Sequence, residues 1–166
     1  SVIGELTKVE FESGVTSIGN YAFEKAISLS SSSITWGGVK SIGDYAFSEC
    51  SGFTGEFTIP NEINTMGTHA FSGCTEITGV SFGNGITTIS NNAFSGCSKL
   101  KSVSFNKVTK IGESSFDGTG FETITIPSSI ASILANAFVN IGTLQKVIYK
   151  GITIGSCLHL EPKTIN

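Results

Sequence analysis

The sequence predicts an α/β repeat fold, a solenoid with one short parallel strand in each repeat of 22–24 residues. Short helical or 3-10 turns, or loops, are expected opposite the strands. One observation is a phenylalanine that recurs at spacings of 24, 24, 23, 22 and 22 residues. Another is an Ile or Met five residues before each of them, with a Val or Ile three residues earlier still. A period of this length indicates stacked copies of one unit. The six phenylalanines are Phe23, Phe47, Phe71, Phe94, Phe116 and Phe138.

The strand of each repeat is expected where two apolar residues flank a single outward position. This alternation has the period of a strand with one buried face. Seven such strands would form a parallel ladder about 30 Å long at the usual strand spacing. The inward pairs are Val9/Phe11, Ile34/Trp36, Phe57/Ile59, Val80/Phe82, Val103/Phe105, Ile124/Ile126 and Val147/Tyr149.

The segment around each Ala-Phe pair is too short for a full helix, and a single 3-10 or α turn is expected there. A glycine stands four residues before the phenylalanine in four repeats, which indicates either a positive φ or a close backbone approach. These glycines are Gly19, Gly43, Gly67 and Gly112. A single repeat cannot bury its own apolar face, so the phenylalanines and aliphatic residues are expected to form one continuous core.

The composition argues against two functions, nucleic-acid binding and membrane insertion. The chain has ten lysines, no arginine and a net charge of −3, so the basic patch of a nucleic-acid-binding protein is absent from the sequence. No apolar run is long enough for membrane insertion. Residues 1–166 are expected to form a single domain of six full repeats with partial terminal repeats, and residues 153–166 are a degenerate repeat or a cap.

Three of the four cysteines, Cys50, Cys74 and Cys97, occupy one repeat position. The other copies hold Ala, Thr or Ile there, which favours buried free thiols that act as small apolar side chains. A disulfide between neighbouring copies is the alternative, since stacked turns lie within bridging range. Zinc is disfavoured because no two cysteines are closer than 23 residues.

The unit L-x-x-V-x-F, followed by V-x-x-I-G-x-x-A-F-x-x-C-x-x-L, resembles the BspA-like, or TpLRR-type, leucine-rich repeats over residues 6 to about 152. The resemblance implies a right-handed curved solenoid on secreted or surface-exposed proteins of bacteria and some protozoa. It also implies adhesion to host proteins, matrix or other cells, and no enzymatic activity.

No arrangement of residues in the sequence indicates catalysis or a cofactor. His69 and His159 are the only histidines, and His69 stands in a repeat position that Tyr, Asn or Ser fills elsewhere. The Gly-rich segments at 83–85 and 118–120 do not open a strand–turn–helix unit, so they do not indicate a phosphate loop. We therefore expect no catalytic, metal or cofactor site.

A partner is expected on the outward face of the strands, because repeat solenoids present such faces for recognition. The predicted partner-binding residues are Lys8, Glu10, Glu12, Thr35, Thr58, Ser81, Ser104, Thr125, Lys146, Ile148 and Lys150. The face has no Trp, Tyr or Arg hot spot, which favours weak or multivalent contacts. An equally weighted interpretation is that these side chains are a solvated strand surface.

The sequence thus predicts an extracellular or cell-surface interaction module that binds a host, matrix or cell-surface protein. The alternatives are a rigid spacer and an accessory domain in a larger surface protein. Neither end of the repeat array has an obvious polar cap, so end-to-end self-association is a further hypothesis.

Overall fold

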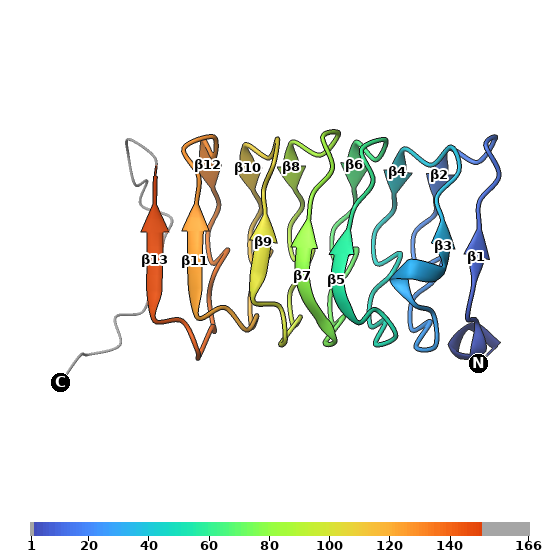
Figure 1. Cartoon of the computed structure of the whole chain (residues 1–166), viewed down its shortest axis with the longest axis horizontal. Coiled ribbons are helices and arrows are strands. Elements are labelled where there is room, and N and C mark those ends of the chain that lie inside the picture. The colour runs from blue at the N-terminus through green and yellow to red at the C-terminus, as the bar shows by residue number, and fades with distance from the viewer. Residues whose placement is uncertain (1, 151–166) are drawn as a thin grey trace.

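Seven parallel strands in one row form the front of the computed structural model, which describes residues 2–150 (Figure 1). We call this row the front ladder. Its members come from successive turns of the chain, so each turn of a parallel-strand solenoid adds one strand. They are β1 (Val9–Glu10), β3 (Ile34–Thr35), β5 (Gly55–Thr58), β7 (Ile77–Ser81), β9 (Ser102–Ser104), β11 (Thr123–Ile126) and β13 (Lys146–Tyr149).

A second row of two-residue strands, which we call the back ladder, was not expected from the sequence. Its strands pair in parallel as β2-β4-β6 and β8-β10-β12. Each of them ends at the Ile or Met that precedes the recurring phenylalanine. Two residues are too few to show the alternation of a strand, so the prediction of one strand per repeat was incomplete. The members are β2 (Ser17–Ile18), β4 (Ser41–Ile42), β6 (Thr65–Met66), β8 (Thr88–Ile89), β10 (Lys110–Ile111) and β12 (Ser132–Ile133).

The Ala-Phe segment contains the single turns that were predicted, closed by hydrogen bonds between residues three apart, and does not continue into a helix. It forms successive hydrogen-bonded turns, and the two 3-10 helices described, η1 (Val2–Glu5) and η2 (Ser31–Ser33), lie elsewhere. The reason is a left-handed backbone at two positions of every copy, two residues before and two residues after the phenylalanine. A left-handed residue interrupts a right-handed helix. Tyr21, at φ 59, and Lys25, at φ 62, are the first such pair.

The recurring phenylalanines form a column of stacked rings through the core. Neighbouring rings from Phe23 to Phe138 are nearly parallel, with centroids 5.3–5.9 Å apart. Phe47, Phe71, Phe94 and Phe116 are fully buried. Strand residues pack on this column from the front, including Trp36, which contacts Phe47 and Phe57 as a partly buried ring. The prediction of one continuous apolar core is confirmed.

The glycines before the Ala-Phe pair serve close backbone approach rather than a positive φ. A Cβ built on Gly67 would lie 2.4 Å from the backbone nitrogen of Asp44 in the preceding turn. The same position in the first turn, Gly19, has nothing within 4 Å because no described turn precedes it. Glycine is therefore required by the stacking of turns, not by the shape of a single turn.

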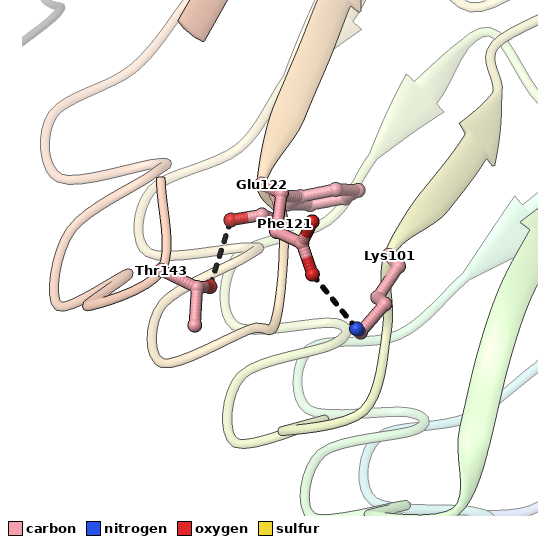
Figure 2. A network of polar contacts seen from close by, with 4 residues as sticks. All are labelled: Lys101, Phe121, Glu122 and Thr143. Carbon is pink, nitrogen blue, oxygen red and sulfur yellow. Dashed lines mark hydrogen bonds and ion pairs between the residues drawn. The ribbon is translucent and has the colours of Figure 1, made fainter. Parts of the chain in front are cut away.

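The front ladder is hydrogen-bonded in three segments, β1-β3, β5-β7-β9 and β11-β13. Side chains join the turns where the ladder is interrupted after β9. The Lys101 ammonium donates to a Glu122 carboxylate oxygen at 2.9 Å, and the Thr143 hydroxyl donates to the Phe121 carbonyl at 2.8 Å (Figure 2). This network links three consecutive turns, and its Lys101–Glu122 contact crosses the interruption between β9 and β11.

Candidate functional site

The predicted partner-binding residues lie on or beside the front ladder, with their side chains exposed or half-buried. Ser81 and Ile148 are half-buried, and the other nine are exposed. The pairing of β5, β7 and β9 places Thr58, Ser81 and Ser104 in one row across three turns. Thr125 is paired with Ile148, and Glu10 with Thr35. The central residues are thus brought together, whereas the two ends of the set are separated by the length of the ladder.

A second row beside the first was not among the predicted binding residues. It consists of Glu56, Gly79 and Ser102, which the pairing of the same three strands aligns. Gly79 has no side chain and is buried between its neighbours. A Cβ there would lie 2.5 Å from the Ser102 hydroxyl and 3.2 Å from Glu56 Cγ. The two flanking side chains therefore converge over the glycine.

These two rows enclose a depression of about 290 Å³ in the middle of the front ladder. Its lining combines Gly79, which has no side chain, with small hydroxylic side chains and one carboxylate. The sequence signal was a glycine at an outward position in the middle of a strand, which indicates close approach of a ligand or another backbone. The lining residues are Glu56, Phe57, Thr58, Gly79, Val80, Ser81, Ser102, Val103 and Ser104.

Charges on the front face lie mainly toward its two ends. Lys8 and Glu10 form an ion pair at the N-terminal end. Lys146 and Lys150 are exposed at the other end of the described chain. The centre of the face offers hydrogen-bonding groups and little charge, which suits a polar protein surface better than a polyanion.

The cysteine position is part of the core and not of a reactive site. Cys50, Cys74 and Cys97 are buried free thiols, as the favoured interpretation of the sequence held. Each thiol donates to a phenylalanine carbonyl of the preceding turn at 3.1–3.2 Å. Burial raises the pKa of Cys50 and of Cys97 to about 12, and it also raises the pKa of Cys74 well above its ordinary value. A thiol held neutral in this way is a poor nucleophile and metal ligand.

His69 belongs to an aromatic stack made by the residues that stand two positions before the recurring phenylalanines of three successive turns. Its ring is parallel to that of Tyr45 at 4.4 Å, and Tyr45 is stacked on Tyr21 at 4.9 Å. Its Nδ1 atom is buried and has no hydrogen-bond partner in the structure. The left-handed position two residues before the phenylalanine therefore holds aromatic residues in the first three turns because their rings pack on one another between turns. His159 and Cys157 fall outside residues 2–150, as does the segment 153–166 that we interpreted as a degenerate repeat or a cap.

Within residues 2–150, no three His, Cys, Asp or Glu side chains gather in a way that could hold a metal ion. That same part of the chain has no helix with the length and apolar character needed to cross a membrane.

A family model described as "BspA type Leucine rich repeat region" matches residues 3–54 and 16–145, in six copies. No curated protein matches the chain. Among solved structures, the chain is similar to a leucine rich cell surface protein from Faecalibacterium prausnitzii A2-165, with a TM-score of 0.62 and 22% identity over 89% of this chain. It is also similar to the leucine rich repeat protein of T. pallidum, TpLRR, with a TM-score of 0.61 and 26% identity over 69% of this chain.

This chain spans about half of each of those two proteins, 48% of the first and 53% of the second. The similarity in fold agrees with the parallel-strand solenoid of Figure 1.

Proposed function

Because the chain belongs to the family of BspA-type leucine-rich repeats, we propose that it is a non-catalytic protein-interaction module of an extracellular or cell-surface protein. One structurally similar protein is described as a cell surface protein, which supports that location. In this proposal the turns wind in a right-handed solenoid, and the front ladder is the side that meets a host, matrix or cell-surface protein.

The observation that carries the proposal is the depression over Gly79. Its rim residues come from three consecutive turns, so it depends on the stacked array and would not exist in a single repeat. Hydroxyls and a carboxylate on a fixed sheet can form hydrogen bonds to a protein surface with little loss of side-chain entropy, because Ser and Thr are short. Thr58, Ser81 and Ser104 are the residues that would contact the partner most directly.

The front face lacks the aromatic and arginine side chains that dominate tight interfaces. We therefore expect each copy to bind weakly, with useful strength arising when many copies on one surface act together. A rigid spacer is the second candidate function. It is favoured by the cross-turn ion pairs Lys25–Glu49, Lys99–Glu76 and Lys101–Glu122, which join successive turns along the stack.

A matched pair of substitutions within one turn tests the proposal. Thr58→Arg places a long side chain at the rim of the depression, whereas Thr65→Arg places the same side chain on the back ladder. Both positions are exposed, so both variants should fold. Immobilised matrix proteins and host-cell surfaces are presented to the wild-type chain as a multivalent display, and binding is measured by biolayer interferometry.

We expect saturable binding to at least one of these surfaces. Thr58→Arg should reduce it at least tenfold, and Thr65→Arg should leave it unchanged. The double variant Lys146→Glu, Lys150→Glu then tells whether the contact reaches the C-terminal end of the face. Equal binding by the two arginine variants would reject the front ladder as the site. A well-folded chain that binds none of the surfaces would favour the spacer.

A further inference from the structure

The depression on the front ladder holds a single charged side chain, the carboxylate of Glu56. Glu56 is exposed, and it has no ion-pair partner in the part of the chain that the structure describes. The two lysines that precede β9 are both paired with other glutamates, at 2.6 Å for Lys99 and 2.9 Å for Lys101. The depression therefore carries a negative charge that the described residues do not neutralise.

The Glu56 side chain lies beside Gly79, its paired residue on β7. A Cβ built on Gly79 would lie 3.6 Å from Glu56 Oε1 and 2.5 Å from the Ser102 hydroxyl oxygen on β9. Gly79 pairs with both neighbouring strands and does not have a positive φ, so its backbone conformation does not require glycine. What glycine provides at this position is open space between a carboxylate oxygen on one side and a hydroxyl oxygen on the other.

The polar side chains of the depression are suited to accept hydrogen bonds. Its lining residues contribute one carboxylate and four hydroxyls, and no side-chain nitrogen. The Ser102 hydroxyl donates to the Thr78 carbonyl at 3.5 Å, which leaves its lone pairs for a ligand. A carboxylate only accepts, and a hydroxyl accepts as well as donates. The chemistry of the depression therefore favours a ligand that brings positive charge and several hydrogen-bond donors.

Among biological cations, the guanidinium group fits this arrangement best. It is planar and has five N–H donors in a fixed fork, so it can reach acceptors on two sides at once. A lysine ammonium is a compact point charge on a flexible stem. A neutral sugar has donors but no charge to balance the carboxylate. The absence of a side chain at Gly79 leaves room for a flat group to lie between Glu56 and Ser102.

We propose that the depression binds an arginine side chain of the partner protein, with the guanidinium held between Glu56 and Ser102. This rests on the proposed function, because the arginine belongs to the protein that the front ladder contacts. It narrows the partner to a protein that presents an exposed arginine. Bonds from a guanidinium to a carboxylate are short and directional. One such contact would therefore fix where the partner sits along the array.

A nuclear magnetic resonance titration of the ¹⁵N-labelled chain tests the proposal without a partner protein. The probe is the capped peptide acetyl-Gly-Arg-Gly-amide. It should shift the backbone amides of β7 and β9 saturably, with a dissociation constant on the order of 1 mM, as suits a single side chain. The same peptide with citrulline keeps the planar group without the charge and should bind about fivefold more weakly. The lysine peptide should also bind more weakly than the arginine peptide.

Two variants locate the contact. Glu56→Gln should weaken binding of the arginine peptide about fivefold. Glu62→Gln is its matched control, because Glu62 is exposed in the same turn but does not line the depression, and it should bind as the wild type does. Gly79→Ala leaves every charge in place but fills the space beside the Ser102 hydroxyl. It should also weaken binding about fivefold, a loss that attraction to an exposed carboxylate alone would not produce. The amide spectrum shows whether each variant is folded.

Several results would overturn the proposal. They are a titration that shifts no amide of β7 or β9, equal binding of the arginine peptide and either control peptide, and wild-type binding by Glu56→Gln or Gly79→Ala. Cellotriose that shifts these amides where the arginine peptide does not would indicate a glycan site instead. Each of these failures leaves open whether the front ladder binds a protein, which Thr58→Arg tests on the partner surfaces.

Discussion

At several positions, contacts with the neighbouring turn restrict the residue type more than the conformation of the residue's own turn does. Gly67 is the clearest case, since its missing side chain leaves room for the Asp44 backbone. The sequence correctly indicated a special glycine here but left two reasons open. Only the distance between adjacent turns, which a single sequence does not contain, separates close approach from a positive φ.

Replacing Gly67 by Ala should lower the free energy of unfolding by about 2–3 kcal/mol, at the upper end of the usual cost of overpacking, because the clash is with backbone. The measurement is urea unfolding followed by circular dichroism at low protein concentration.

Gly19→Ala is the matched control, since Gly19 has the same place in the repeat but open space around it. Its cost should stay within about 0.5 kcal/mol. Similar losses at both positions would mean that the turn itself, and not the stacking, requires glycine.

The buried thiols make the free energy of unfolding depend on pH in the alkaline range. Cys50 and Cys97 keep their protons up to about pH 12 in the folded chain, whereas unfolding returns them to an ordinary pKa of 9.0. Because the pKa is raised in the folded state, the thiols make their full contribution to the free energy of unfolding below pH 9. That contribution is lost as the pH rises toward 12. The free energy of unfolding should therefore fall over this window.

Cys97→Ala isolates this effect from the titration of lysines and tyrosines. The variant will start less stable because a core atom is lost. Its stability should nevertheless fall less steeply with pH than that of the wild type between about pH 9 and about pH 11. Unfolding curves at three pH values give the two slopes. Parallel slopes would mean that Cys97 is ionised or exposed in the folded protein.

Among the elements, the column of phenylalanine rings was the most predictable part of the structure. The rings recur at a nearly constant spacing, and a constant spacing in a solenoid places them directly above one another. The back ladder was not predictable in the same way. Its strands have two residues each, and residue alternation cannot be recognised over so short a length. The left-handed positions were missed because Asn or Gly occupies them in only some of the repeats, and the Tyr, His, Lys and Glu found in the others seldom adopt a positive φ.

The phenylalanine rings of the column should contribute unequally to the free energy of unfolding, depending on their place in the array. Phe71 is fully buried and contacts rings on both sides, at 5.5 Å and 5.4 Å. Phe71→Ala should cost about 3–5 kcal/mol of the free energy of unfolding, the range for a fully buried aromatic side chain.

Phe23 provides the comparison, because it is only partly buried and stacks on one side. Phe23→Ala should cost about half as much, since it exposes less apolar surface on unfolding. Both values come from the same denaturant titration. A cost for Phe23 equal to that for Phe71 would show that the first turn is as well covered as the inner ones.

For the whole molecule, the sequence predicted the order of the turns and the row of strands, and the structure agrees on both. It did not predict the depression on the front ladder. That feature needs the pairing of Glu56, Gly79 and Ser102 across three turns, and the pairing passes a register shift between Gly55 and Glu56. Nor did it predict that Val15, a residue of the expected core, would be 37% exposed. The repeat pattern assigns Val15 to the core, but only a preceding turn could cover it.

The stacking of turns also determines how the protein would respond to a mechanical load. β1 and β13 lie at opposite ends of the array, and the strands run across its long axis (Figure 1). A pull on the two ends therefore opens the hydrogen bonds between adjacent turns one after another, instead of shearing a whole sheet at once. Each released turn of about 23 residues would lengthen the chain by about 80 Å. In an optical trap we expect a staircase of small, similar extensions at low force, whereas one large step would show that the array breaks as a single unit. A protein that lengthens in this way would limit the peak force transmitted between two surfaces that it joins.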